Sequence, residues 1–144
     1  MGDTGFLGCF ATLAGEWQLI RSISSGEKLD GTCVFDWRDD HSLLATESGE
    51  LQIADGSIIN AHRQWVWQAE NDALNVFFHE KPLRLYHRVN LSLVGNTWTG
   101  SSHHDCAPDT YLGEYEISPE NLIVRQDISG PKKDYRIYTR YSRS

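Results

Sequence analysis

The sequence lacks the features that mark several classes of protein. It contains no apolar run near the roughly 20 residues that a membrane-spanning helix needs. The formal net charge is -7, and the 13 Lys and Arg residues form no stripe that would attract a polyanion. We therefore expect neither nucleic acid nor a membrane as a partner.

Cysteine is scarce, and its number is odd. The chain has Cys9, Cys33 and Cys106, and no basic segment followed by an apolar one occupies residues 1–15. This usage is typical of free thiols in a reducing compartment rather than of a disulfide framework. We expect a cytoplasmic protein whose 144 residues bury a core without a covalent staple.

Familiar catalytic signatures are missing as well. There is no glycine-rich loop to hold a phosphate, no serine on a nucleophile elbow and no convincing pair of carboxylates. No pattern indicates a cofactor. Repeats, linkers and low-complexity tracts are also absent, which indicates one domain over residues 1–144.

What the sequence does contain is a long series of segments with two-residue alternation. The first begins at Gly15-Glu16-Trp17 and the last ends at Tyr141, with turn residues between them at an even spacing. Such spacing is typical of an all-β sandwich or barrel, and a tryptophan early in the first strand can plug the closed end of a small barrel. We predict an antiparallel up-and-down β-barrel of about ten strands, with a short helix in residues 5–13 across one end.

Alternation also predicts which side chains face the interior, because neighbours along a strand point to opposite faces of the sheet. For the last strand the pattern leaves two faces open, Tyr135 and Ile137 on one and Arg136 and Tyr138 on the other. The predicted interior set includes Trp17, Leu19, Ile23, Ala61, Arg63, Trp65, Trp67, Leu83, Leu85, His87, Val89, Leu91, Leu93, Tyr111, Tyr115 and Gln126.

Residues 10–20 (FATLAGEWQLI), the meander pattern and the arginines of the last strand resemble the lipocalins and fatty-acid-binding proteins of the calycin superfamily. The resemblance implies a calycin-type barrel, and it implies that Arg140 or Arg143 packs on the indole of Trp17 by cation–π attraction. Arg136-Ile-Tyr138 is similar to the Arg-x-Tyr that holds a carboxylate in fatty-acid-binding proteins. The helical lid of those proteins has no counterpart in the short segment 24–30.

The whole chain also resembles a small family of unknown function. The resemblance rests on His104-x-Cys106-x-x-Asp109-x-Tyr111 and on Gly130-Pro131-x-Lys133-Asp134-Tyr135. It implies no activity.

Arg63 is the sharpest candidate for a functional residue. It lies on an apolar face between Ala61 and Trp65, and a guanidinium cannot lose its charge on burial. Its partner is then a ligand carboxylate, phosphate or enolate. The alternatives are an internal ion pair with Glu47 and simple exposure near the barrel mouth.

His87 is a second polar residue on an apolar face. Burial favours its neutral ring, with one nitrogen donating and the other accepting. Such a ring can orient a ligand or move a proton, or it can be a core histidine bonded to Tyr111 or Tyr115. The candidate ligand-binding residues as a whole are Arg63, Trp65, His87, His104, Tyr111, Tyr115, Gln126 and Tyr135.

A metal site is only weakly indicated. His104 and Cys106 share one strand face, and Asp109 follows across a turn. Zinc needs three or four ligands, and this pattern places two. We therefore expect no metal, with these three residues as the weak candidates.

We predict a monomer or homodimer that binds a small, partly apolar, anionic or heteroaromatic molecule inside the barrel without covalent chemistry. Arg63 neutralises the ligand, Trp65 and Tyr115 stack on it, and His87 and Tyr111 donate or accept hydrogen bonds.

Two other classes of function stay open. One is an isomerase, cyclase or lyase in which His87 is the base and Tyr111 the acid. The other is an interaction module whose barrel is filled by aromatic side chains and whose partner binds an outer patch around Phe77 or Tyr86.

Overall fold

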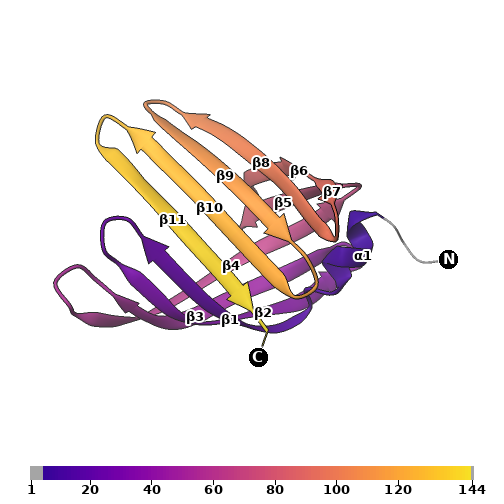
Figure 1. Ribbon diagram of the computed structural model, residues 1–144, viewed down its shortest axis with the longest axis horizontal. Helices are drawn as coiled ribbons and strands as arrows, with labels where there is room; N and C mark the ends of the chain where they lie inside the picture. Colours follow the sequence, from indigo (N-terminus) through magenta and orange to yellow (C-terminus); the bar gives the residue numbers. More distant parts are fainter. Residues whose placement is uncertain (1–4, 144) are drawn as a thin grey trace.

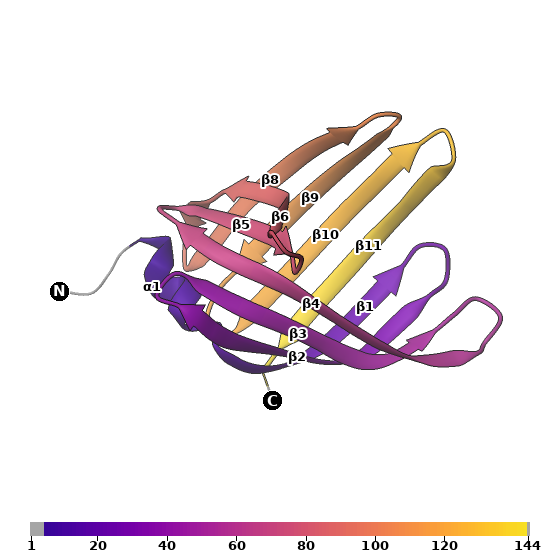
Figure 2. The ribbon, with the colours of Figure 1, turned by 180° about the vertical axis from the view of Figure 1, so that it is seen from behind.

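The computed structural model describes residues 5–143, and these form one short helix and a single sheet of eleven antiparallel strands. The strands run alternately up and down around the wall of a nearly closed barrel (Figures 1 and 2). The elements are α1 (Phe6–Ala11), β1 (Gly15–Ile23), β2 (Lys28–Asp39), β3 (Ser42–Gln52), β4 (Ile58–Glu70), β5 (Ala73–Phe78), β6 (Arg84–Asn90), β7 (Ser92–Val94), β8 (Thr97–Cys106), β9 (Asp109–Ile117), β10 (Asn121–Gly130) and β11 (Lys133–Ser142).

The strands follow the order β6-β5-β4-β3-β2-β1-β11-β10-β9-β8-β7. Strands that follow one another in the chain are therefore paired, except for β6 and β7, which are the two edges of the sheet. In addition, β1 pairs with β11. The prediction of an all-β up-and-down barrel with a short helix is confirmed.

Helix α1 closes one end of the barrel (Figure 1). Its Phe6 and Phe10 are fully buried, and the Phe6 ring lies 5.7 Å from that of Trp98. This aromatic cluster removes a large apolar area from water and is the main reason why so short a helix is stable here. Within the described residues, no helix is both long enough and apolar enough to cross a membrane.

Trp17 plugs the same end, as predicted. Its indole N–H donates to the carbonyl of Leu13 at 2.8 Å, and the Arg143 guanidinium carbon lies 4.0 Å from its ring centroid. Gly15 adopts φ 119°, and a Cβ there would lie 3.4 Å from Nη1 of Arg143. Of the two arginines that the lipocalin resemblance offered, Arg143 is thus the one that covers Trp17.

The segment 83–93 is two strands rather than the single strand that the alternation suggests. β6 pairs with β5, and after Leu91 the chain crosses to pair with β8 as β7. In the β5–β6 ladder, Val76 pairs with His87 but Phe77 pairs with Leu85, so β6 has one extra residue, Tyr86, at this point. Such a bulge changes which way part of β6 faces. The interior prediction is wrong at Leu93, which lies in β7 beyond the crossing at Leu91 and is 50% exposed.

In β11 the apolar face points inward. Tyr141 is buried, whereas Arg136 forms an ion pair with Asp127 and Tyr138 lies under the guanidinium of Arg125 on the outer face. The inward carboxylate-binding role that the resemblance gave to Arg136-Ile-Tyr138 is therefore wrong, because the pleat directs both side chains to solvent.

Candidate functional site

A cavity of about 940 Å³ lies inside the barrel and reaches the end formed by the β1–β2, β3–β4 and β10–β11 turns. That end lies away from α1 (Figure 1). Its lining includes residues beside three hairpin turns, such as Ile23, Leu51 and Ile128. Leu85 lines the cavity while being 50% exposed, so this end is open to solvent. A concave, mostly apolar space of this size is typical of small-molecule sites.

Most of the candidate residues meet in this cavity, although they come from five different strands. Seven of the eight predicted ligand-binding residues line it, namely Arg63, Trp65, His104, Tyr111, Tyr115, Gln126 and Tyr135. The eighth, His87, does not.

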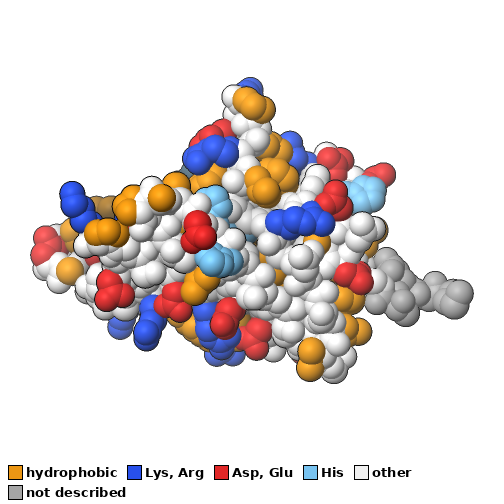
Figure 3. All heavy atoms as spheres, turned by 90° about the horizontal axis from the view of Figure 1, so that it is seen from above, with side chains coloured by type: hydrophobic (Ala, Val, Ile, Leu, Met, Phe, Trp, Pro, Cys, Tyr) orange, Lys and Arg blue, Asp and Glu red, His pale blue; other side chains and the backbone are white. Residues whose placement is uncertain are grey.

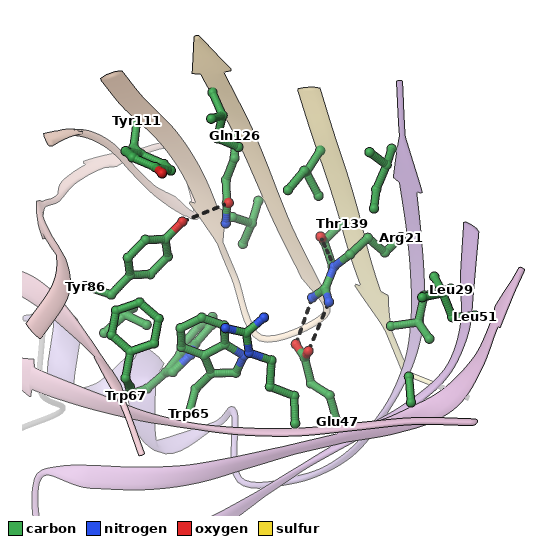
Figure 4. A pocket seen from close by; sticks show the side chains of 18 of the residues that line it. Arg21, Leu29, Glu47, Leu51, Trp65, Trp67, Tyr86, Tyr111, Gln126 and Thr139 are labelled. Atoms are coloured by element: carbon green, nitrogen blue, oxygen red, sulfur yellow. Dashed lines mark hydrogen bonds and ion pairs between the residues drawn. The ribbon is translucent and has the colours of Figure 1, made fainter. Parts of the chain in front are cut away.

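One wall is aromatic. The Trp65 ring stacks on Tyr86 with centroids 5.4 Å apart and lies 5.1 Å from Phe78. Tyr86 crosses the cavity and donates its hydroxyl hydrogen to Oε1 of Gln126 at 3.2 Å (Figure 4). Alternation predicted Tyr86 on the outer surface; the register shift in the β5–β6 ladder accounts for its place inside.

Opposite this wall, Arg21 and Glu47 form an ion pair inside the barrel (Figure 4). Nη1 and Nη2 of Arg21 lie 3.0 and 2.8 Å from the two carboxylate oxygens, and Nε donates to Thr139 at 2.9 Å. Tyr141 also donates to Glu47, at 3.0 Å, and burial raises the pKa of this phenol well above its ordinary value. Both oxygens of Glu47 are thus occupied.

Sequence reasoning missed Arg21, although the signal was present. Arg21 alternates with Leu19 and Ile23 on the inward face of its strand. The suggested ion pair between Arg63 and Glu47 is wrong: the two are cross-strand neighbours, but Glu47 pairs with Arg21 and no ion pair joins it to Arg63 among the described residues.

Arg63 is left without a carboxylate among residues 5–143. Its guanidinium carbon lies 4.4 Å from the ring centroid of Trp65, and the side chain lines the cavity in an exposed position. A guanidinium that lies over an indole and makes no ion pair is suited to bind an anion.

His87 lies behind the cavity wall. It is 2% exposed, and its Nδ1 lies 3.0 Å from the hydroxyl of Tyr115. Burial, with a smaller effect of His104, lowers the pKa of His87 to about 4, so the ring is neutral at pH 7. The hydroxyl of Tyr111 accepts a hydrogen bond from Lys133 at 3.0 Å, so His87 and Tyr111 have different hydrogen-bond partners, and of the two only Tyr111 lines the cavity.

The weak metal candidates do not gather into a site. Among the described residues, no group of three or more His, Cys, Asp and Glu side chains could hold an ion. Asp109 is instead 3.2 Å from Nζ of Lys133, while His104 and Cys106 line the exposed cavity rim.

Fold and site together define a nearly closed, up-and-down β-barrel with an internal cavity open at one end. The chain belongs to the family of unknown function DUF6314, whose model matches residues 13–143. A search of curated proteins finds no match.

Solved structures support the barrel fold. The chain is similar to the barrel EF1p2_mFAP2b bound to DFHBI, with a TM-score of 0.53 and 14% identity over 94% of this chain and 97% of that one. It is also similar to the redesigned β-barrel mFAP0 bound to DFHBI, with a TM-score of 0.50 and 14% identity over 92% of this chain and 99% of that one. At this identity the similarity concerns the fold alone.

Proposed function

We propose that this protein binds one small, partly apolar molecule that carries an anionic or heteroaromatic group inside its barrel. The observation that carries the proposal is the cavity of about 940 Å³ in which Arg63, whose guanidinium lies over the Trp65 ring, has no carboxylate partner among the described residues. The space supplies apolar burial, and the guanidinium supplies a charge that a ligand anion neutralises.

The balance of charge in the lining favours an anion. Within residues 5–143, three arginines and one glutamate line the cavity. Arg21 is neutralised by Glu47, and Arg84 forms an exposed pair with Glu80. Arg63 is therefore the uncompensated cation of the lining, in a chain whose formal net charge is -7.

Two further observations support a binding barrel. Two barrels of similar fold are described as bound to the small molecule DFHBI. The face drawn in Figure 3 carries Lys and Arg interspersed with Asp and Glu, a distribution unsuited to a polyanion. Tyr86 lines the cavity. It is therefore not available for the outer patch, around Phe77 or Tyr86, that we expected of an interaction module.

The same proposal covers the kinship of the barrel, its cellular setting and its oligomeric state. The contact of Arg143 with Trp17 supports kinship with lipocalin-type barrels, and three free cysteines support a reducing, cytoplasmic setting. We propose a monomer or homodimer, which size-exclusion chromatography with light scattering tests directly.

The first test measures the mass of any ligand that purifies with the protein. Native mass spectrometry of freshly purified protein, compared with the denatured mass, should reveal an adduct that Arg63→Ala loses. Arg136→Ala is the matched control, because Arg136 is 83% exposed on the outer face. An adduct retained equally by both variants contradicts the role of Arg63.

A second test does not require a co-purified ligand. We use 1-anilinonaphthalene-8-sulfonate and N-phenyl-1-naphthylamine, which share their rings and differ in the sulfonate. The sulfonate should bind about tenfold more tightly, a difference of ~1.4 kcal/mol, and Arg63→Gln should abolish that preference while Arg136→Gln keeps it. Absence of binding by either probe would argue against the cavity as a ligand site.

A further inference from the structure

The barrel closes between β6 and β8 without strand pairing in the part of the chain that the structure describes. The two backbones nevertheless come close, because a Cβ on Gly100 of β8 would lie 2.2 Å from the carbonyl oxygen of Asn90. No hydrogen-bonded ladder therefore joins β6 to β8 at this junction, which we call the seam.

Two buried polar atoms at the seam have no hydrogen-bond partner among residues 5–143. They are Nε2 of His87, on β6, and Oγ of Ser102, on β8. The two residues are 2% and 8% exposed. Leaving a buried donor or acceptor without a partner costs free energy, so such a pair indicates a bound group.

Both side chains lie close to one point of the neighbouring strand β9, the Cβ position of Gly113, which carries no side chain. Gly113 is the cross-strand partner of Ser102. A Cβ on Gly113 would lie 2.8 Å from Oγ of Ser102 and 3.3 Å from Cε1 of His87, with Tyr115 Cε1 at 3.5 Å. We call these four residues the seam site.

The hydrogen-bond pattern assigns the tautomer of His87. If the Tyr115 hydroxyl donates to Nδ1, His87 carries its hydrogen on Nε2, and that N–H alone is left over from the pair. In the opposite arrangement both the Tyr115 O–H and the bare Nε2 lack partners. The first arrangement leaves fewer unpaired groups, so Nε2–H points to the seam site as a donor.

We propose that the seam site binds one neutral oxygen, which accepts a hydrogen bond from Nε2–H of His87 and exchanges a second one with Oγ of Ser102. A hydroxyl or water oxygen fits because it both accepts and donates. A charged group does not fit, because the site supplies no opposite charge.

Water is the occupant that the geometry favours. Neither His87 nor Ser102 lines the cavity, and the ring of Tyr86 stacks on His87 with centroids 3.8 Å apart. Of the four seam residues, Tyr115 alone lines the cavity. The bound oxygen links His87 of β6 to Ser102 of β8, where no backbone hydrogen bonds join the two strands.

The test is made first on ligand-free protein. Long-range 1H–15N spectra of the histidine rings should show His87 as the Nε2–H tautomer, with a cross-peak from Nε2–H to a long-lived water. Ser102→Ala should weaken or remove that cross-peak, whereas Ser101→Ala, an exposed neighbour on the same strand, should retain it. Gly113→Ala, whose methyl group enters the site, should also remove it.

A high-resolution crystal structure gives a second readout that does not depend on any variant folding. It should show an oxygen within hydrogen-bond distance of both Nε2 and Oγ. An Nδ1–H tautomer, a direct Ser102–His87 bond, or the absence of both cross-peak and density would overturn the proposal.

The source of the oxygen is decided with 2-naphthoate and 6-hydroxy-2-naphthoate. Retention of the water cross-peak with both acids supports a resident water. Its loss with the hydroxy acid alone, together with tighter binding that Ser102→Ala removes, supports a ligand hydroxyl. If neither acid binds, the proposed cavity function is weakened, while the seam site is still judged on the ligand-free protein.

Discussion

Arg21 binds Glu47 through two parallel hydrogen bonds of 3.0 and 2.8 Å, although β2 separates their strands. Arg21 is opposite Leu29 of β2, and Glu47 is opposite Cys33 of β2. The two side chains therefore meet across Gly31, midway between those residues. A Cβ there would lie 2.1 Å from the carbonyl oxygen of Ser48, so this point of the wall has no room for a side chain. The ion pair thus spans β2 at a glycine, where no side chain lies between the two residues.

We predict that Glu47→Gln destabilises the protein strongly. The substitution leaves Arg21 charged inside the barrel without its carboxylate, and breaking a buried pair costs about 3–5 kcal/mol. Urea unfolding measures the loss. Glu116→Gln, which breaks the exposed pair with Arg125, should cost less than about 1 kcal/mol, and equal losses would contradict the buried character of the Arg21–Glu47 pair.

Stability should fall as the pH drops from about 6.5 to about 4 because of His87. Burial lowers its pKa in the folded protein to about 4, from an ordinary 6.5. In this window the unfolded chain binds a proton that the folded protein does not, so the stabilisation present above pH 6.5 is lost toward pH 4. The loss from this residue is about 3 kcal/mol.

Two measurements check the His87 prediction. Unfolding free energies across this pH window should show a smaller slope for His87→Gln than for the unchanged protein. An NMR titration of the His87 ring reads its pKa directly, and a value near 6.5 would refute the prediction.

Removing Arg143 should destabilise the closed end of the barrel. Its guanidinium lies 4.0 Å from the Trp17 ring centroid, and such contacts contribute about 0.5–1 kcal/mol at exposed sites. We expect Arg143→Ala to lower the unfolding free energy by about 1 kcal/mol. Arg140→Ala is the control, since Arg140 is exposed on the outer face, and it should leave stability nearly unchanged in the same urea titration.

The three cysteines should differ in reactivity. Cys106 is exposed at the cavity rim, whereas Cys33 is fully buried and burial raises the pKa of the Cys9 and Cys33 thiols. Iodoacetamide should therefore modify Cys106 first and Cys33 only after unfolding. Mass spectrometry of the digested protein follows each site.

The same labelling reports on the cavity. Bound 1-anilinonaphthalene-8-sulfonate should slow the alkylation of Cys106, which lines the cavity, and leave the rate at Cys9 unchanged. A slowing of both sites alike would place the probe elsewhere.

Much of the candidate site was predictable from alternation. Trp65, Tyr111 and Gln126 line the cavity because each lies in a regular stretch where every second residue faces inward. Arg21 obeyed the same rule and could have been named. Tyr86 could not, because a one-residue register shift in the β5–β6 ladder displaced it from the expected face.

By itself, the sequence determined the all-β class, the meander order and the closed end around Trp17, since these follow from local periodicity and turn chemistry. Only the tertiary structure decided that Arg21 rather than Arg63 takes Glu47, that Arg143 rather than Arg140 covers Trp17, and that His87 lies behind the cavity wall. Those choices depend on which distant strands meet and at what register. That register is set by barrel closure, to which the whole chain contributes.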